Sequence, residues 1–545
     1  MMKAGIGVLL CGLGGMLAAI PAKADPVRVL LLTGQNNHAW RETTPVLQRI
    51  LEGTRRFEVD VTEEPESMTF ESLSPYGLLL SNWNSWGQDV RVKEWPKVAQ
   101  DALIAFMKEG KGFVSVHAGS SSFYDWREYQ ELAITSWKIG ETGHGKRHSF
   151  RVTPTAEKHP ITGGMLPFAI FDELWHCVPT PPETQILATA YSSEESGGTG
   201  ADEPVVMVRE FGQGRSVNIL LGHDVQAMSH ESFAILLSRA AEWAATGRVT
   251  LPSRRIEWSE DSERLTLKVN GDTLWQFNYG DTAAKPYFHP LAPAGGPPLT
   301  WEAPPDHAWH HALWFSWKYI NGVNFWEENP ETGRAAGVTA WERPRFRTRR
   351  DGSAQIRLDL RYEPAPGRTA LTERRTLSIS PPDNEGEYSI DWKSVFTARE
   401  PEVVLDRTPI AGEPDGKAWG GYAGLSVRFS PMNDPRIHSD AAVVTLSDGK
   451  TNLDAPALDY SGVIDGQIYG VAILSLSGNS PCPTPWYVIG QSENSFYYFS
   501  PALLYRSART LKKGEKLTLS YRIWVHPGEW DSGKLREALA ESSSK

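Results

Sequence analysis

The chain has 545 residues, of which 40% are hydrophobic and 22% are charged, and its formal net charge is −11. This length predicts two to four domains, since a domain commonly holds about 100–200 residues. The negative charge argues against nucleic acid as a partner, because binding to phosphates requires a positive surface.

The first 24 residues have the pattern of a secretory signal peptide. Lys3 precedes an apolar stretch from Ile6 to Ile20, and Ala22 and Ala24 form a small-x-small cleavage signal. We therefore expect cleavage after Ala24 and a periplasmic or secreted protein. No later stretch reaches the about 18 uninterrupted apolar residues of a membrane span, so none is expected.

Strand and helix patterns alternate from Val27 to about Thr250. Buried strands are predicted for VRVLLL (Val27–Leu32), YGLLLS (Tyr76–Ser81) and GFVSVH (Gly112–His117), helices for residues 95–110 and 233–247, and a hairpin for Pro204–Asp224. The alternation predicts an α/β domain over residues 25–252, with a mostly parallel sheet covered on both faces.

Short alternating runs separated by turn residues follow from about Ile256 to His526. Runs such as RLTLKVNG, AQIRLDLRYE and LTLSYRIWVH are typical of strands with one buried face. They predict an all-β sandwich over residues 253–535. A short helix and a polar tail, residues 536–545, are expected to end the chain.

Polar residues follow most of the predicted strands of the first domain. Because ligands bind at the carboxyl ends of strands in an open α/β sheet, these residues are candidates for one site. Those expected to act in catalysis are His117, Glu173, His223 and Asp224, and those expected to contact the substrate are His38, Asn82 and Trp83.

Two kinds of chemistry fit these residues. Histidine beside a carboxylate exchanges protons near neutral pH, with His117 or His223 as the base. Alternatively, imidazoles hold a divalent cation, with His38, His117 and His223 as the ligands. No other cofactor is expected.

Five segments of the first domain, in this order, resemble the ThuA-like (trehalose utilisation) family: LLLTGQNNHAW, GFVSVHAGSSSF, HPITGGM, DELWH and GRSVNILLGHD. The resemblance implies a flavodoxin-like fold of the class I glutamine amidotransferase type, without the elbow cysteine and its glutaminase chemistry. It places His117 in the elbow region and implies a role in sugar metabolism, particularly of 3-keto sugars. His38, His117, Glu173, His223 and Asp224 match the recurring polar positions.

A string rich in histidine and tryptophan, PPDHAWHHALWFSWKYINGVNFWEE (Pro304–Glu328), marks the second domain. Together with YFHPLAPAGG, GGYAGLSVRFS, LDYSG and YRIWVHPGEW it is similar to the PmoA-like family over about residues 256–530. The architecture resembles sandwiches that bind or rearrange sugars, such as mutarotase-like domains. That resemblance implies a substrate-binding site lined by His289, His307, His310, His311, Arg428 and His526.

These features predict an exported carbohydrate-active protein that cleaves or modifies a glycoside, in particular a 3-keto glycoside. A non-catalytic protein that binds glycans with both domains is the alternative. A hydrolase with two carboxylates is a third hypothesis, although the adjacent Asp172 and Glu173 would point to opposite faces of a strand.

Overall fold

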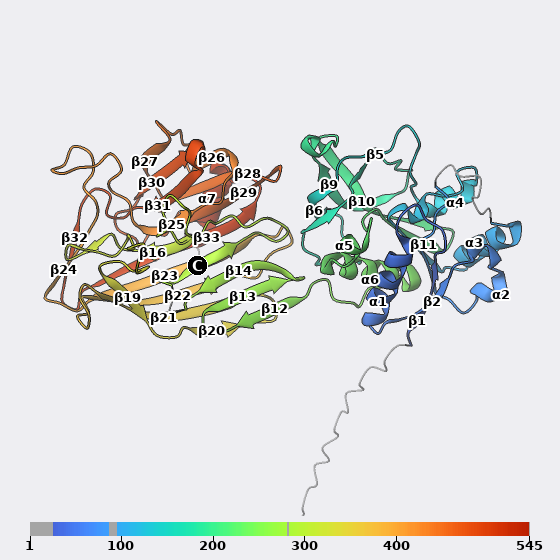
Figure 1. Cartoon of the computed structure of the whole chain (residues 1–545), viewed down its shortest axis with the longest axis horizontal. Helices are drawn as coiled ribbons and strands as arrows, with labels where there is room; N and C mark the ends of the chain where they lie inside the picture. Colours follow the sequence, from blue (N-terminus) through green and yellow to red (C-terminus); the bar gives the residue numbers. More distant parts are fainter. Residues whose placement is uncertain (1–24, 87–94, 281–282, 544–545) are drawn as a thin grey trace, which may run out of the picture.

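The computed structural model describes residues 25–86, 95–280 and 283–543, which form two adjacent lobes (Figure 1). The first lobe is α/β and ends with a helix at Thr246, and the second is rich in strands and begins at Ile256. The expected signal peptide, residues 1–24, lies outside the described residues. None of the helices in the described part of the chain has the length and hydropathy needed to cross a membrane.

A single mixed sheet is the centre of the α/β lobe. The elements are β1 (Val27–Leu32), α1 (Trp40–Gly53), β2 (Phe57–Thr62), α2 (Phe70–Leu73), β3 (Leu78–Ser81), α3 (Lys97–Lys108), β4 (Gly112–Val116), α4 (Arg127–Ala133), β5 (Gly143–His144), β6 (His148–Pro154), β7 (Phe168–Asp172), β8 (Trp175–His176), β9 (Gln185–Ser192), β10 (Ala201–Phe211), β11 (Gly214–Ile219), α5 (Val225–Met228) and α6 (Glu231–Thr246). The strand order is β2-β1-β3-β4-β11-β10-β9-β6-β7. The first five strands are parallel in the flavodoxin-like order. The last four are joined by antiparallel pairs, so the expectation of a mostly parallel sheet is corrected to a mixed one.

Strand β1 explains why the parallel half needs helices on both faces. Successive residues of a strand point to opposite faces, and all of Val29 to Leu32 are apolar and buried. Val29 and Leu31 pack in one cluster with α1 and α6, whereas Leu30 and Leu32 pack in another with α3 and α4. Because helices cover both faces of this half of the sheet, a ligand can approach it only at the ends of the strands.

The second lobe consists almost entirely of strands. They are β12 (Ile256–Glu260), β13 (Arg264–Val269), β14 (Asp272–Asn278), β15 (Tyr287–Leu291), β16 (Leu313–Ser316), β17 (Tyr319–Ile320), β18 (Val323–Asn324), β19 (Val338–Trp341), β20 (Arg345–Thr348), β21 (Ala354–Glu363), β22 (Leu371–Ile379), β23 (Tyr388–Ala398), β24 (Glu402–Asp406), β25 (Gly424–Arg428), β26 (Asn433–Ser439), β27 (Lys450–Ala455), β28 (Ala457–Ile464), β29 (Gln467–Ser475), β30 (Thr484–Gln491), β31 (Phe496–Pro501), β32 (Arg509–Lys512) and β33 (Lys516–Pro527). Two nine-stranded sheets share one core, to which Phe277 and Phe499 contribute from one sheet and Trp392 and Ile523 from the other. This is the expected β-rich architecture.

A helix ends the described part of the chain. Helix α7 runs over Ser532–Ser543, and Leu535 and Ala538 pack in a cluster with Ala457 and Trp530. The short helix expected in this segment is therefore present, and it extends to Ser543, into residues 536–545 that were expected to be a polar tail.

The two lobes contact each other at the start of α6. Asn270 donates a hydrogen bond from Nδ2 to Ser232 Oγ at 3.1 Å, and Arg255 pairs with Glu231 at 3.1 Å. His230 Nε2, next to them, lies 3.7 Å from an oxygen of Asp272. The first turn of this helix is thus held by the neighbouring lobe.

Candidate functional site

Four polar side chains meet where strands β1, β4, β7 and β11 end. His117 follows β4 directly, and Glu173 follows β7 directly. His38 comes from the loop between β1 and α1, and His223 from the loop between β11 and α5. The carboxyl ends of strands in such a sheet are the usual place for a ligand site, and all four residues were predicted from sequence.

Asp172, the last residue of β7, ties that strand to the loop that carries His223. Its buried carboxylate accepts the backbone N–H of Gly222 at 2.6 Å and of His223 at 3.0 Å. It also accepts the N–H of Glu173 at 2.9 Å. Since a buried carboxylate requires such donors, Asp172 positions Glu173 and His223 while its own oxygens are occupied.

Glu173 is the centre of the cluster. Its Oε1 accepts a hydrogen bond from Trp175 Nε1 at 3.0 Å and lies 3.6 Å from His117 Nε2. Its Oε2 lies 3.8 Å from His223 Nε2 and 3.4 Å from His144 Nδ1. One buried carboxylate therefore faces three imidazoles.

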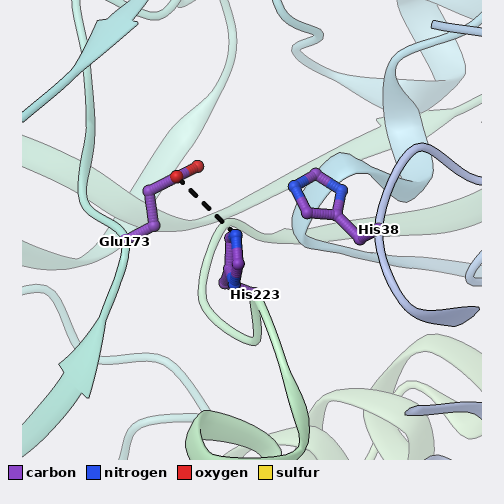
Figure 2. A group of neighbouring side chains, drawn as sticks. All are labelled: His38, Glu173 and His223. Atoms are coloured by element: carbon purple, nitrogen blue, oxygen red, sulfur yellow. Dashed lines mark ion pairs between the residues drawn. The ribbon is translucent and has the colours of Figure 1, made fainter. Parts of the chain in front are cut away.

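Figure 2 shows His38, Glu173 and His223 converging from three separate segments. One ligand atom of each lies within 4.8 Å of the others. Ligands of a tetrahedral cation at about 2.0 Å stand about 3.3 Å apart, so small side-chain movements would bring the three atoms onto one ion. Glu173 takes the place in this trio that the sequence hypothesis gave to His117, which lies beside it.

Hydrogen bonds fix the orientation of two of the imidazoles. Nδ1 of His117 donates to the carbonyl of Leu220 at 2.8 Å, and Nδ1 of His38 donates to Asn36 Oδ1 at 3.2 Å. Such bonds set which ring nitrogen stays free to act as an acceptor or ligand. Nε2 of His117 is buried and has no hydrogen-bond partner within the described residues.

The charges of the cluster follow from burial and from mutual contact. Burial alone would raise the pKa of Glu173, but contact with His117 and with the Trp175 N–H lowers it to about 2. Burial and the neighbouring His117 and His223 lower the pKa of His38 to about 3. At neutral pH Glu173 is thus ionised and His38 neutral, the forms that bind a divalent cation.

His117 differs from the other imidazoles. Burial disfavours its charged form, yet the Glu173 and Asp172 carboxylates outweigh burial and raise its pKa. His223 has a lowered pKa, because it is partly buried and lies near His117. The pKa of His117 is therefore shifted in the opposite direction from the pKa values of His38 and His223.

A cavity of about 220 Å³ adjoins the cluster. Its walls include Trp86, Trp137 and Trp175, and its polar groups include His38 and Glu173. The volume is below the about 300–1,000 Å³ of pockets for drug-sized ligands. It is therefore suited to one small ring beside the polar cluster.

The backbone turns sharply at His117. Its φ is +48°, a left-handed value that is uncommon for a residue other than glycine. Gly119 follows two residues later, where an added Cβ would lie 2.2 Å from the carbonyl oxygen of Ser81. Gly119 is thus required by the close approach of β3, and the strained turn aims His117 at the site.

We expect Gly119→Ala to destabilise the α/β lobe by about 1–3 kcal/mol, because overpacking against backbone forces the turn to shift. Thermal unfolding followed by circular dichroism measures the effect. Gly53→Ala is the matched control, since nothing lies within 4 Å of an added Cβ there. Equal stability of the two variants would contradict the prediction.

Three predicted residues lie outside the cluster. Asn82 is buried and donates from Nδ2 to Thr43 and Thr44 at 3.0 and 3.1 Å. Trp83 is 1% exposed and stacks on Phe123 in the core. Asp224 caps α5 through the N–H of Ala227 and pairs with Arg147 at 2.6 Å. The side chains of these three residues therefore make structural contacts near the strand ends, and none of them lines the cavity.

Sequence reasoning missed His144 and the tryptophan walls of the cavity. His144 lies on β5, a two-residue strand paired with β8, and such a short element leaves no periodic signal. Trp175 stands two residues after Glu173, a spacing that places both side chains on one face of an extended segment. That spacing is the sequence signal that could have indicated Trp175 as a neighbour of Glu173.

The predicted residues of the β-rich lobe do not form one cluster. His311 is held between Glu302 at 3.1 Å and Glu328 at 2.8 Å. His289 Nδ1 is 3.1 Å from Thr300 Oγ1, and His526 pairs with Asp459 at 2.8 Å. His307 and His310 alone among the predicted histidines line a cavity of about 460 Å³, and Arg428 binds the carboxylate of Asp306 beside it at 2.9 Å.

Residues 264–540 match the model of DUF6807, a family of unknown function, and residues 28–244 match the model of ThuA, described as trehalose utilisation. The ThuA-like resemblance is thus confirmed for the N-terminal half. The PmoA-like resemblance of the C-terminal half is not confirmed, because the matching family there is DUF6807. No curated protein matches this chain.

Several solved structures are similar to parts of the chain. A ThuA-like protein from Parabacteroides merdae is 31% identical, with 42% of this chain and 93% of that chain covered and a TM-score of 0.38. A ThuA-like protein from Bacteroides uniformis is 17% identical, with coverage of 42% and 98% and a TM-score of 0.34. A beta-galactosidase from Rahnella sp. R3 is 15% identical, with coverage of 50% and 40% and a TM-score of 0.28.

Proposed function

Because the chain belongs to DUF6807 over residues 264–540 and has a ThuA-like domain over residues 28–244, we propose that it is an exported carbohydrate-active enzyme. Its N-terminal centre would use a divalent cation held by His38, Glu173 and His223. The observation that carries the proposal is the approach of their ligand atoms to within 4.8 Å of one another. Two imidazoles and one carboxylate suit transition cations such as Zn²⁺ and leave a position open for substrate.

The family description and the cavity support the proposal of a sugar substrate. Trehalose utilisation names a sugar pathway, and Trp86, Trp137 and Trp175 offer flat apolar faces next to polar groups. Aromatic side chains with a polar N–H suit ligands that combine apolar and polar surface. A glycoside that carries a ketone at C3 supplies an oxygen for the cation and a hexose ring for the cavity.

The proposed reaction is an elimination that cleaves the glycosidic bond. His117 Nε2 removes the proton from C2, α to the ketone, and the electron pair forms the C2=C3 enolate. A cation held by His38, Glu173 and His223 would supply Lewis-acid stabilisation of the enolate oxygen. As the ketone at C3 reforms, the C1=C2 double bond forms and the C1–O bond breaks, and the glycosidic oxygen takes up a proton and leaves as the alcohol.

We expect His117→Gln to keep its cation and to lose turnover by about 10²–10⁴-fold, the usual contribution of a positioned base. Metal content and cleavage of 3-keto-trehalose and methyl 3-keto-glucoside measure the two effects separately. His159→Gln is the control, because His159 packs on Trp243 away from the cluster.

Two outcomes would contradict this function. Metal-loaded wild-type protein that leaves both keto sugars intact would favour the alternative of a glycan-binding protein. Equal turnover of His117→Gln and wild type would show that His117 is not the base. The cation would then have to act in a different mechanism.

A further inference from the structure

The outer face of one β-rich sheet is aromatic where a polar surface is expected. Phe315 and Phe499 point into the shared core, whereas their strand neighbours Trp314 and Tyr498 belong to a separate aromatic cluster. Neighbouring strand residues point to opposite faces, so this second cluster lies on the far side of the sheet. A sheet face that does not pack on a core normally carries polar residues.

A cavity of about 460 Å³ lies over this face. Its aromatic walls include Trp309, Trp326, Trp419, Tyr422, Phe496 and Tyr498. Trp419 is 52% exposed at its edge, with its ring 6.2 Å from that of Tyr422. A large exposed indole beside an aromatic cavity is typical of a binding surface.

Histidines supply polar groups at this cavity. His307 Nδ1 donates to Asp306 at 2.8 Å, and Arg428 holds both oxygens of that carboxylate at 2.9 Å. This arrangement leaves Nε2 of His307 for a ligand. His310 is 4% exposed, and its Nδ1 has no hydrogen-bond partner in the part of the chain that the structure describes.

A fixed carboxylate completes the polar lining. Glu327 accepts hydrogen bonds from Tyr422 Oη at 2.9 Å and Asn324 Nδ2 at 2.6 Å, and it pairs with Lys318. Lys318 balances the charge of Glu327, and Lys450, which also lines the cavity, donates to the carbonyl of Ala418 at 2.8 Å.

We propose that this cavity is a second saccharide-binding site, independent of the metal-assisted chemistry of the α/β lobe. The C–H face of a neutral pyranose ring would stack on Trp419, and a hydroxyl group would bond with Nε2 of His307. A cationic ligand fits less well. Lys318 already lies 5.3 Å from the centre of the Tyr422 ring, and Arg428 lies 4.0 Å from that of Phe496.

The test is isothermal titration calorimetry of the full chain with trehalose, cellobiose and the methyl α- and β-glucopyranosides. We expect Trp419→Ala and His307→Ala each to weaken binding of the recognised sugar about five- to tenfold. Trp419→Phe should restore part of the affinity, because it keeps a stacking ring. Phe70→Ala, a change at an exposed aromatic residue of α2 in the other lobe, should have no effect.

Glu173→Gln separates this site from the N-terminal centre. Unchanged sugar binding in Glu173→Gln supports a separate site, even where the proposed enzymatic function fails. Three results would overturn the proposal: no probe bound by wild type, binding lost in Glu173→Gln but kept in Trp419→Ala, or choline bound more tightly than every sugar.

Discussion

Replacing Glu173 by glutamine should lower the affinity of the N-terminal centre for a divalent cation by at least about 100-fold. Loss of a residue that merely supports a metal ligand typically costs about 10–100-fold, and Glu173 is the carboxylate of the trio with His38 and His223. Glutamine keeps the size of the side chain but removes the negative charge. Elemental analysis after dialysis, together with competition against a fluorescent chelator, measures the change.

The matched control for this substitution is Glu128→Gln, which makes the same chemical change on the exposed first turn of α4. That variant should retain the wild-type metal content. Stoichiometric cation in Glu173→Gln, or a cation-free wild type after incubation with Zn²⁺, Mn²⁺ and Fe²⁺, would show that the trio is not a metal centre.

Glu373→Ala should destabilise the β-rich lobe by about 3–5 kcal/mol, the usual cost of removing one partner of a buried ion pair. Arg375 and Glu373 are both fully buried, and their side chains are joined by hydrogen bonds of 2.7 and 2.9 Å. Tyr362 also donates to this carboxylate, at 2.6 Å. Without Glu373, the guanidinium and the hydroxyl would remain in the core without their acceptor.

Denaturant unfolding followed through tryptophan fluorescence of the β-rich lobe measures this loss. Arg374→Ala is the control one residue before Arg375, because its side chain is 79% exposed and pairs with Asp359 at 3.3 Å. Exposed pairs contribute about 0–1 kcal/mol. A loss in Glu373→Ala no larger than that of Arg374→Ala would mean that the core accommodates the unpaired guanidinium.

The parallel half of the first sheet was predictable because its strands are buried on both faces. VRVLLL, YGLLLS and GFVSVH are apolar at nearly every position, and they became β1, β3 and β4. Strands β6 and β9 alternate in burial and are joined by antiparallel pairs, so they resemble ordinary half-exposed segments. The sequence pattern therefore did not indicate where the parallel sheet ends.

The start of α1 shows how local signals mislead. Threonine is a common N-cap residue, so Thr43 or Thr44 could have preceded the first turn of this helix. The helix instead begins at Trp40, and both threonines are residues of its first turns. Thr44 instead shares a hydrogen bond with Thr33 at 2.7 Å, and both threonines accept from Asn82. Tertiary contacts to the neighbouring strand ends thus replaced the capping role.

The candidate site was predictable to the extent that its residues follow strands. His38, His117, Glu173 and His223 share that position, and the fold brings strand ends together. His144, which lies on the two-residue strand β5, contacts Glu173. Trp86 and Trp137 line the cavity from loops. Such approaches depend on the path of loops, for which a single sequence contains no periodic signal.

The contact between the lobes limits how the chain can be recombined. Ser232 and Glu231, which bind Asn270 and Arg255 of the β-rich lobe, stand within ten residues of His223 in the sequence. A fusion that joins this α/β lobe to an unrelated partner would have to supply substitutes for both contacts. The two lobes are therefore better regarded as one matched unit than as interchangeable modules.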